Sequence, residues 1–131
     1  MPNPTQYKKI SDRYLCASDL LVDDVHEVAG FSLYHAFESM GAAWIRKDGK
    51  DVPFKHESKI NKFVSLSRRI GAHHGIGRVA ILVIGLRNKM LYPIPEIPSD
   101  FSMPHIKFSV SEIKDLSRRV KGVLRIIRPL I

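Results

Sequence analysis

Disulfide bonds are excluded within this 131-residue chain, because Cys16 is its only cysteine. A single thiol is typical of a reducing compartment. Long apolar runs are also missing: the longest, residues 79–86, is far shorter than the roughly 20 residues that span a bilayer. The first residues, MPNPTQYKK, contain no apolar segment typical of a signal peptide. We therefore expect a cytoplasmic protein that has no membrane partner.

Several enzyme motifs are missing as well. No cysteine and histidine spacing is typical of a zinc site, and no glycine-rich phosphate loop is found. The spacing His-x-x-Glu occurs once, at His35 and Glu38, whereas di-metal bundles need two Glu-x-x-His motifs and further carboxylates. We expect neither a metal nor a cofactor.

Charge is distributed unevenly along the chain. Residues 1–40 carry six acidic and three basic side chains, whereas residues 55–131 carry fifteen basic and five acidic ones. The formal charges of the two segments are therefore −3 and +10. A basic second half suits a polyanionic partner such as RNA, DNA or a nucleotide. On charge alone, a solvated surface without a specific partner explains the pattern equally well.

Apolar residues recur at spacings of three and four in five segments, which is the spacing of one helix face. The predicted helices are 5–22, 25–46, 57–70, 78–90 and 109–128. Capping boxes are indicated at Asp24 with Glu27 and at Ser109 with Glu112. The apolar face predicted for the first helix consists of Tyr7, Ile10, Tyr14, Ala17 and Leu21.

The segment from residue 78, RVAILVIGLRNKML, permits a buried strand or a buried helix. We favour a helix, because its apolar positions continue at helical spacing beyond the length of a strand. Before it, residues 73–77 are predicted to form a turn, and after it Pro93, Pro95 and Pro98 predict an extended connection. The sequence therefore predicts a single all-α domain, 1–131, built as an antiparallel up-and-down bundle of about five helices.

Three polar residues interrupt the expected core. His35 and Glu38 share one face of the second helix, and Arg87 falls on the buried side of the fourth. A buried arginine needs a carboxylate or a phosphate. Two interpretations are open: a structural Arg87–Glu38 ion pair, or a cleft in which Arg87 binds an anion. On the last helix a basic stripe runs beside the apolar one and consists of Lys114, Arg118, Lys121 and Arg125.

The order of helices, the sequence Tyr34-His35-Ala36-Phe37-Glu38-Ser39 and the sequence Leu86-Arg87-Asn88 together resemble the HEPN superfamily. This resemblance implies a small helical bundle, a homodimer, and RNA or nucleotide as the partner. It also implies a metal-independent ribonuclease of the toxin–antitoxin or defence type, which in some systems is bound by an antitoxin protein.

The family motif is an arginine, a polar residue and a histidine after four to six intervening positions. Arg87 and Asn88 match its first part, but the histidine position is occupied by Tyr92. A phenol with a pKa of about 10 is a poor base at neutral pH. Three explanations are open: Tyr92 acts in a slower reaction, His35 or His73 supplies the imidazole, or the domain binds without cutting. The predicted site is Arg87, Asn88, Tyr92, Glu38 and His35, with the four cations of the last helix as phosphate contacts. The alternative is a non-catalytic interaction module whose basic helix contacts an acidic protein.

Overall fold

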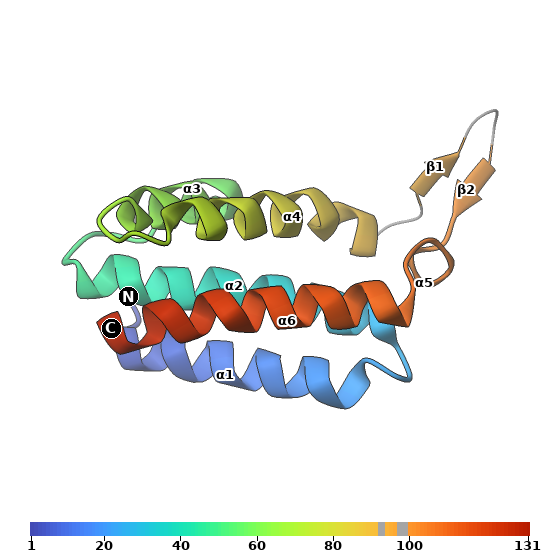
Figure 1. Ribbon diagram of the computed structural model, residues 1–131, viewed down its shortest axis with the longest axis horizontal. Helices are drawn as coiled ribbons and strands as arrows, with labels where there is room; N and C mark the ends of the chain where they lie inside the picture. Colours follow the sequence, from blue (N-terminus) through green and yellow to red (C-terminus); the bar gives the residue numbers. More distant parts are fainter. Residues whose placement is uncertain (92–93, 97–99) are drawn as a thin grey trace.

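The computed structural model describes residues 1–91, 94–96 and 100–131, and helices make up most of them. A short hairpin and a one-turn helix join the fourth long helix to the last one (Figure 1). The elements are α1 (Pro4–Leu21), α2 (His26–Lys47), α3 (His56–Ser67), α4 (His73–Leu91), β1 (Ile94–Glu96), β2 (Asp100–Ser102), α5 (Pro104–Lys107), α6 (Val110–Ile127) and the 3-10 turn η1 (Arg128–Leu130). The predicted all-α bundle is confirmed.

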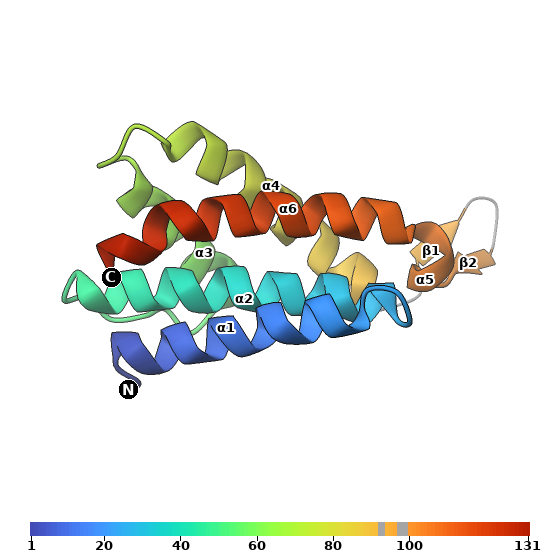
Figure 2. The ribbon, with the colours of Figure 1, turned by 60° about the horizontal axis from the view of Figure 1, so that its bottom comes forward.

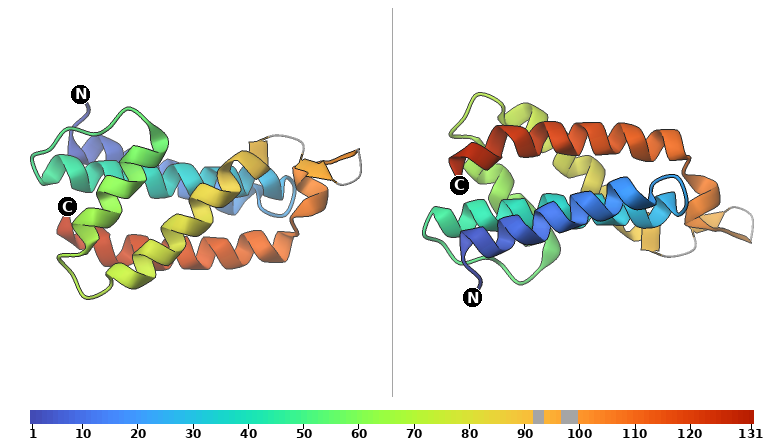
Figure 3. Two further views of the ribbon diagram at one scale, coloured as in Figure 1. Left: turned by 90° about the horizontal axis from the view of Figure 1, so that it is seen from above. Right: turned by 90° about the horizontal axis from the view of Figure 1, so that it is seen from below.

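The long helices are arranged in three layers (Figures 1 and 2). Helices α2 and α6 form the middle layer, α1 lies on one side of it, and α3 and α4 cross the other side diagonally (Figure 3). One connection departs from a simple up-and-down order, since α2 and α3 run in the same direction. Loop 48–55 carries the chain back along α2 before α3 begins. This return places the start of α3 beside the middle of α2.

Helix α2 is the centre of the core, because its apolar residues surround the helix instead of forming one stripe. Leu33, Phe37 and Met40 are completely buried on it. The ring of Phe63 on α3 packs edge-on against Phe37 and Trp44, with centroids 5.1 and 5.9 Å apart. Glycine permits a close approach here: a Cβ added at Gly41 would lie 2.8 Å from the Phe63 ring.

Helix α1 packs differently from the prediction. Its predicted core face is only partly covered, and Ile10 and Tyr14 are 40% and 36% exposed. The residues of α1 that are buried are Ser11 and Ser18, and the Ser11 hydroxyl donates a hydrogen bond of 2.7 Å to the carbonyl of Ala36. Small side chains let α1 approach α2 closely, which turns the larger apolar side chains toward the edge of the interface.

A series of ion pairs joins α1 and the turn after it to the C-terminal part of the chain. Asp12 pairs with Arg128, Asp19 with Lys121 at 2.6 Å, and Asp23 with Lys114 at 3.1 Å. The partners follow one another in opposite directions along the chain, as expected for antiparallel helices. The acidic first segment and the basic last segment are thus paired with each other.

The ends of the helices test the predicted capping signals. The capping box of Ser109 and Glu112 is confirmed at the start of α6. The one predicted from Asp24 and Glu27 is wrong, because Val25 is the N-cap of α2 and makes no side-chain capping bond. At the other end of α2, Gly49 has a φ of 79°. Backbone bonds from Gly49 to Arg46 and from Lys50 to Ile45 complete a Schellman motif there.

One prediction around α4 is wrong and one is confirmed. Residues 73–77 belong to the helix and not to a turn, since the fully buried side chain of Ile76 extends the helix's contact with the core by one turn. The helix favoured for the segment from residue 78 is confirmed, which excludes the strand alternative for residues 79–86. The predicted extended connection includes an antiparallel pair in which Pro95 lies opposite Phe101. No helix in the described residues has the length and apolar character needed to cross a membrane.

Candidate functional site

Four helices bring polar and aromatic side chains together around the middle of α2. We call this group the Arg87 cluster. Its members are Tyr14 from α1, Phe31, Tyr34, His35 and Glu38 from α2, His56 and Lys59 from α3, and Arg87 from α4. Three of the five predicted site residues, Arg87, His35 and Glu38, therefore lie in one cluster. The side chain of Asn88 and the whole of Tyr92 lie outside the described residues.

Glu38 is the buried acid of the cluster, with only 6% of its surface exposed. Both carboxylate oxygens lie 2.9 Å from Nδ1 of His56, and Oε1 accepts a hydrogen bond of 2.5 Å from Nζ of Lys59. Burial acts to raise the pKa of Glu38, but the hydrogen bonds from Lys59 and His56 outweigh it and hold the pKa below its usual value. Glu38 is therefore ionised at neutral pH.

The ion pair predicted between Arg87 and Glu38 is not among the contacts of Glu38 in the part of the chain that the structure describes. The reason is the return of loop 48–55, which brings two α3 side chains directly to the carboxylate. The guanidinium of Arg87 lies instead over the ring of Tyr34, 5.4 Å from its centroid, and 6.0 Å from that of Phe31. Such cation–π contacts help to hold a guanidinium in place.

Tyr34 connects the two halves of the cluster. Its ring contacts Arg87 on one side and His56 on the other, where the ring centroids are 6.2 Å apart. Burial and the neighbouring Glu38 carboxylate raise the pKa of its phenol far above the usual range. The phenol is therefore a hydrogen-bond donor and not a base at neutral pH.

His35 is enclosed by aromatic rings. It stacks on Tyr14 with a centroid distance of 4.8 Å and meets the edge of Phe31 at 4.4 Å. Burial lowers the pKa of His35, and the charge of Arg87 acts in the same direction while Glu38 opposes it. The neutral imidazole is thus the favoured form in the folded protein.

This lowered pKa predicts a loss of stability in mild acid. In the unfolded chain His35 takes up a proton near pH 6.5, whereas the folded state resists it, so stability falls as the pH drops through this value. We expect the free energy of unfolding, measured by urea denaturation between pH 8 and 5, to fall less steeply for His35→Gln than for the unmodified protein. An identical slope for the two would contradict the prediction.

A groove of about 930 Å³ adjoins the cluster. It lies between the start of the chain, loop 48–55 and the first turn of α3. Its walls are Met1, Pro2, Tyr7, Val52, Pro53, Phe54, Lys55, His56 and Lys59. His56 and Lys59 belong to both the groove and the cluster, so these two side chains connect the groove with the buried carboxylate of Glu38. Phe54 is 99% exposed beside the groove and offers an uncovered aromatic ring.

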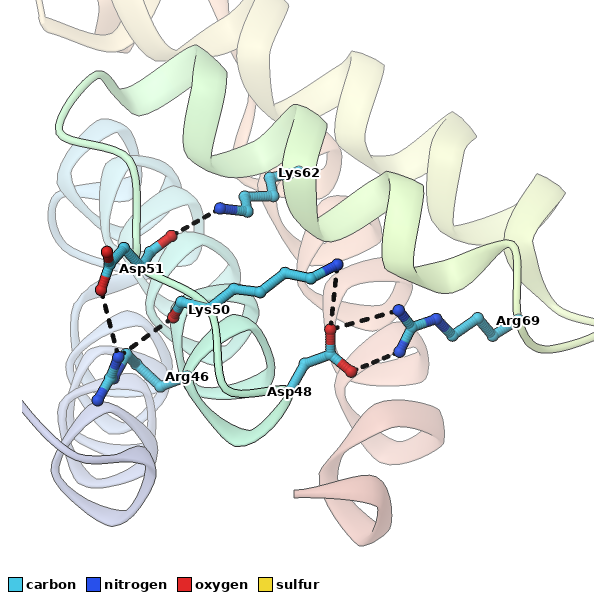
Figure 4. A network of polar contacts seen from close by, with 6 residues as sticks. All are labelled: Arg46, Asp48, Lys50, Asp51, Lys62 and Arg69. Atoms are coloured by element: carbon cyan, nitrogen blue, oxygen red, sulfur yellow. Dashed lines mark hydrogen bonds and ion pairs between the residues drawn. The ribbon is translucent and has the colours of Figure 1, made fainter.

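A network of polar contacts holds loop 48–55 in place (Figure 4). Asp48 pairs with Arg69 and with Lys50, the latter at 3.4 Å. Arg46 pairs with Asp51 at 3.5 Å, and Lys62 donates a hydrogen bond of 2.8 Å to the Asp51 carbonyl. The loop is thus fixed to α2 on one side and to α3 on the other, and it forms a defined wall of the groove.

The predicted phosphate contacts on α6 do not form a free basic stripe. Lys114 and Lys121 are paired with acids near α1, and Arg118 is paired with Asp115 on its own helix. Arg125 is exposed, and no ion pair of it is found within the described ranges. The sequence pattern shows which cations share a face, but not which acids lie opposite them.

His56 and Lys59 were missed by the sequence analysis. Glu38 was the one indication in the sequence, because a buried carboxylate requires hydrogen-bond donors. The spacing of apolar residues, however, does not indicate which helix supplies those donors. His73, the other histidine considered, stacks on His74 in the first turn of α4, with centroids 3.9 Å apart. It is separated from Arg87 by about 20 Å of helix and does not belong to the cluster.

Chemically, the site combines one fixed guanidinium, one ammonium, two imidazoles and several aromatic faces. Residues outside the gaps 92–93 and 97–99 contain no group of three or more histidine, cysteine, aspartate or glutamate side chains that could hold a metal ion. Comparison with protein-family models, with curated proteins and with solved structures finds no match to this chain.

Proposed function

We propose that the Arg87 cluster and the adjoining groove bind RNA or a nucleotide, as the resemblance to HEPN proteins implies. The observation that carries this proposal is the open groove, whose lining includes Phe54, Lys55 and His56. His56 also belongs to the cluster in which the Arg87 guanidinium lies over the ring of Tyr34. Guanidinium and ammonium groups bind phosphates, and exposed aromatic rings stack on bases. The α6 cations contribute less than predicted, because most of them are already paired.

The proposal predicts a large loss of affinity when Arg87 is removed. A hydrogen bond to a charged group contributes about 1.5–3 kcal/mol, so Arg87→Ala is expected to weaken binding of a short single-stranded RNA about 10- to 100-fold. Fluorescence anisotropy at low salt measures the affinity. The matched control is Arg78→Ala, an exposed arginine near the other end of α4, which is expected to bind like the unmodified protein. Equal losses of RNA affinity in the two variants would show that Arg87 is not part of the binding site.

Two of the features expected for the alternative, a non-catalytic interaction module, are not found as predicted. Glu38 takes its partners from α3, and two of the four basic side chains predicted on α6 are paired with acids near α1. Steep weakening of RNA binding with salt favours the nucleic-acid function, and no binding at low salt favours the interaction module. A ribonuclease activity, an antitoxin partner and a defence role stay predictions.

We also propose that the chain forms a homodimer through the outer face of α4. Ile81 is 73% exposed there, and Leu82 and Leu86 line a groove of about 1040 Å³ with Phe108 and the start of α6. Exposed apolar surface of this kind marks protein contacts. Ile81→Glu is expected to convert a dimer to monomers in light scattering, whereas Ile106→Glu, which alters an equally exposed side chain on α5, should not. A monomeric unmodified protein would contradict the proposal.

A further inference from the structure

His56 is bonded to a buried carboxylate and is also open to solvent. Its Nδ1 lies 2.9 Å from both oxygens of Glu38, yet 47% of its side chain is exposed while that of Glu38 is 6% exposed. An ionised carboxylate only accepts hydrogen bonds, so Nδ1 must carry the hydrogen. The neutral imidazole then has its free electron pair on Nε2. A carboxylate that orients a histidine in this way is the arrangement used for general-base catalysis.

The exposed part of His56 belongs to the groove. Its neighbours along the groove include Phe54, Lys55 and Lys59, and across the ring of Tyr34 lies the guanidinium of Arg87. A phosphate bound by Lys55 and Lys59 in the groove would bring the hydroxyl of the attached sugar close to an imidazole that can accept a proton. His35 cannot act as this base, since its ring is enclosed by a stacking contact with Tyr14 and an edge-on contact with Phe31.

We propose that His56 is the general base of a metal-free cleavage of RNA bound in the groove, with Glu38 as the residue that positions it. This inference rests on the proposed binding of RNA. The proton of a ribose 2′-hydroxyl moves to Nε2 of His56, the 2′-oxygen forms a bond to the adjacent phosphorus, and the bond from phosphorus to the 5′-oxygen breaks. The 5′-oxygen takes a proton from water. The products are a 2′,3′-cyclic phosphate and a 5′-hydroxyl, and no oxidant or reductant is required.

Other titratable and charged groups around His56 will shape the dependence of the rate on pH. They are Tyr34, His35 and Glu38 on α2, Lys55, Glu57 and Lys59 at the start of α3, Arg87 on α4, and the N-terminal amino group and Tyr7 at the start of the chain. For this reason the pH profile is compared between variants and is not assigned to His56 from its shape alone.

The experiment measures binding and cleavage of one single-stranded RNA and of the DNA of the same sequence. The unmodified protein is expected to cleave the RNA and to leave the DNA intact, because DNA lacks the 2′-hydroxyl.

His56→Gln is expected to bind RNA with nearly unchanged affinity but to cleave it at least about 100-fold more slowly. Added imidazole should restore part of the rate in His56→Ala, and a rate increase with pH should be lost in His56→Gln. Glu38→Gln should slow cleavage and shift that profile. His74→Gln, an exposed histidine on α4, is the matched control.

The outcomes separate the two proposals. Failure of the unmodified protein to bind RNA would overturn both the binding function and the role of His56. Binding without cleavage, or cleavage by His56→Gln at the unmodified rate, would overturn only the role of His56. A slow His56→Ala variant that imidazole does not rescue would also count against it, because a structural loss is not repaired by a small base.

Discussion

The Gly41→Ala variant is expected to be less stable than the unmodified protein by about 2 kcal/mol, although alanine is the better helix former. A Cβ at this position would lie 2.8 Å from Cγ and Cδ1 of Phe63 and 3.0 Å from its Cβ. Phe63 is fully buried, and its Cβ is fixed to the backbone of α3. The ring therefore cannot move away alone, and α3 must shift.

Gly30→Ala is the matched control on the same helix. There the added Cβ would approach Met90, at 2.5 Å from Sδ and 2.8 Å from Cε, which are the mobile end of a flexible side chain. We expect this variant to change stability by less than about 1 kcal/mol, since the gain in helix propensity offsets the rearrangement. Urea unfolding measures both variants. Equal stabilities for Gly41→Ala and Gly30→Ala would show that α3 adapts at no cost.

The same variant links stability to the site. Glu38 lies three residues before Gly41 on α2, and His56 and Lys59 precede Phe63 on α3. A shift of α3 therefore moves the two donors away from the carboxylate. We expect Gly41→Ala to weaken RNA binding even under conditions in which the protein remains folded, and Gly30→Ala to leave binding unchanged.

Phe63→Ala should have the largest effect on stability, a loss of about 3–5 kcal/mol. The ring fills the space between Phe37 and Trp44, and its removal leaves a cavity that these rigid aromatic side chains close poorly. Because the free energy of unfolding of a domain is about 5–15 kcal/mol in total, this variant would lose a large fraction of its stability and unfold at a clearly lower temperature. Circular dichroism during thermal denaturation measures the change.

Phe54→Ala provides the control for Phe63→Ala, because Phe54 is 99% exposed and its removal should alter stability by no more than about 0.5 kcal/mol. A double variant tests the contact directly. If Gly41→Ala is destabilising because of the Phe63 ring, it should cost much less in the Phe63→Ala background. If the stability losses of the two substitutions are additive, the effect of Gly41→Ala does not come from its contact with the Phe63 ring.

Helix positions could be predicted from the sequence, because the spacing of apolar residues is a local property. The capping box at Ser109 illustrates this, and the fully buried Ile113 and Val120 lie on the predicted face of α6. The face of α1 could not be predicted, because Ser11 and Ser18 are buried through a close approach to α2 that no hydrophobicity pattern shows. Burial there is decided by side-chain size.

The candidate site was predictable only in part for a similar reason. His35, Glu38 and Arg87 are unusual within apolar helices, and the structure brings them into one cluster. His56 and Lys59 lie at the start of α3, where a polar residue is ordinary. Their place beside Glu38 depends on the return of loop 48–55, whose path is determined by contacts such as that between Arg69 and Asp48, which are distant in the sequence.

The ion pairs of α1 with the C-terminal part have a consequence for any polyanion that meets this chain. Asp12, Asp19 and Asp23 act as counterions within the protein, because they pair with cations that would otherwise attract small ions or nucleic acid. Binding to those cations would release no small ions, and so it would lack the entropic gain that drives most association with nucleic acids. The net charge of +8 is therefore a poor guide to where a strand is attracted. The attraction is left to cations that the acids of α1 and the turn after it do not pair with, such as the exposed Lys55 in the groove.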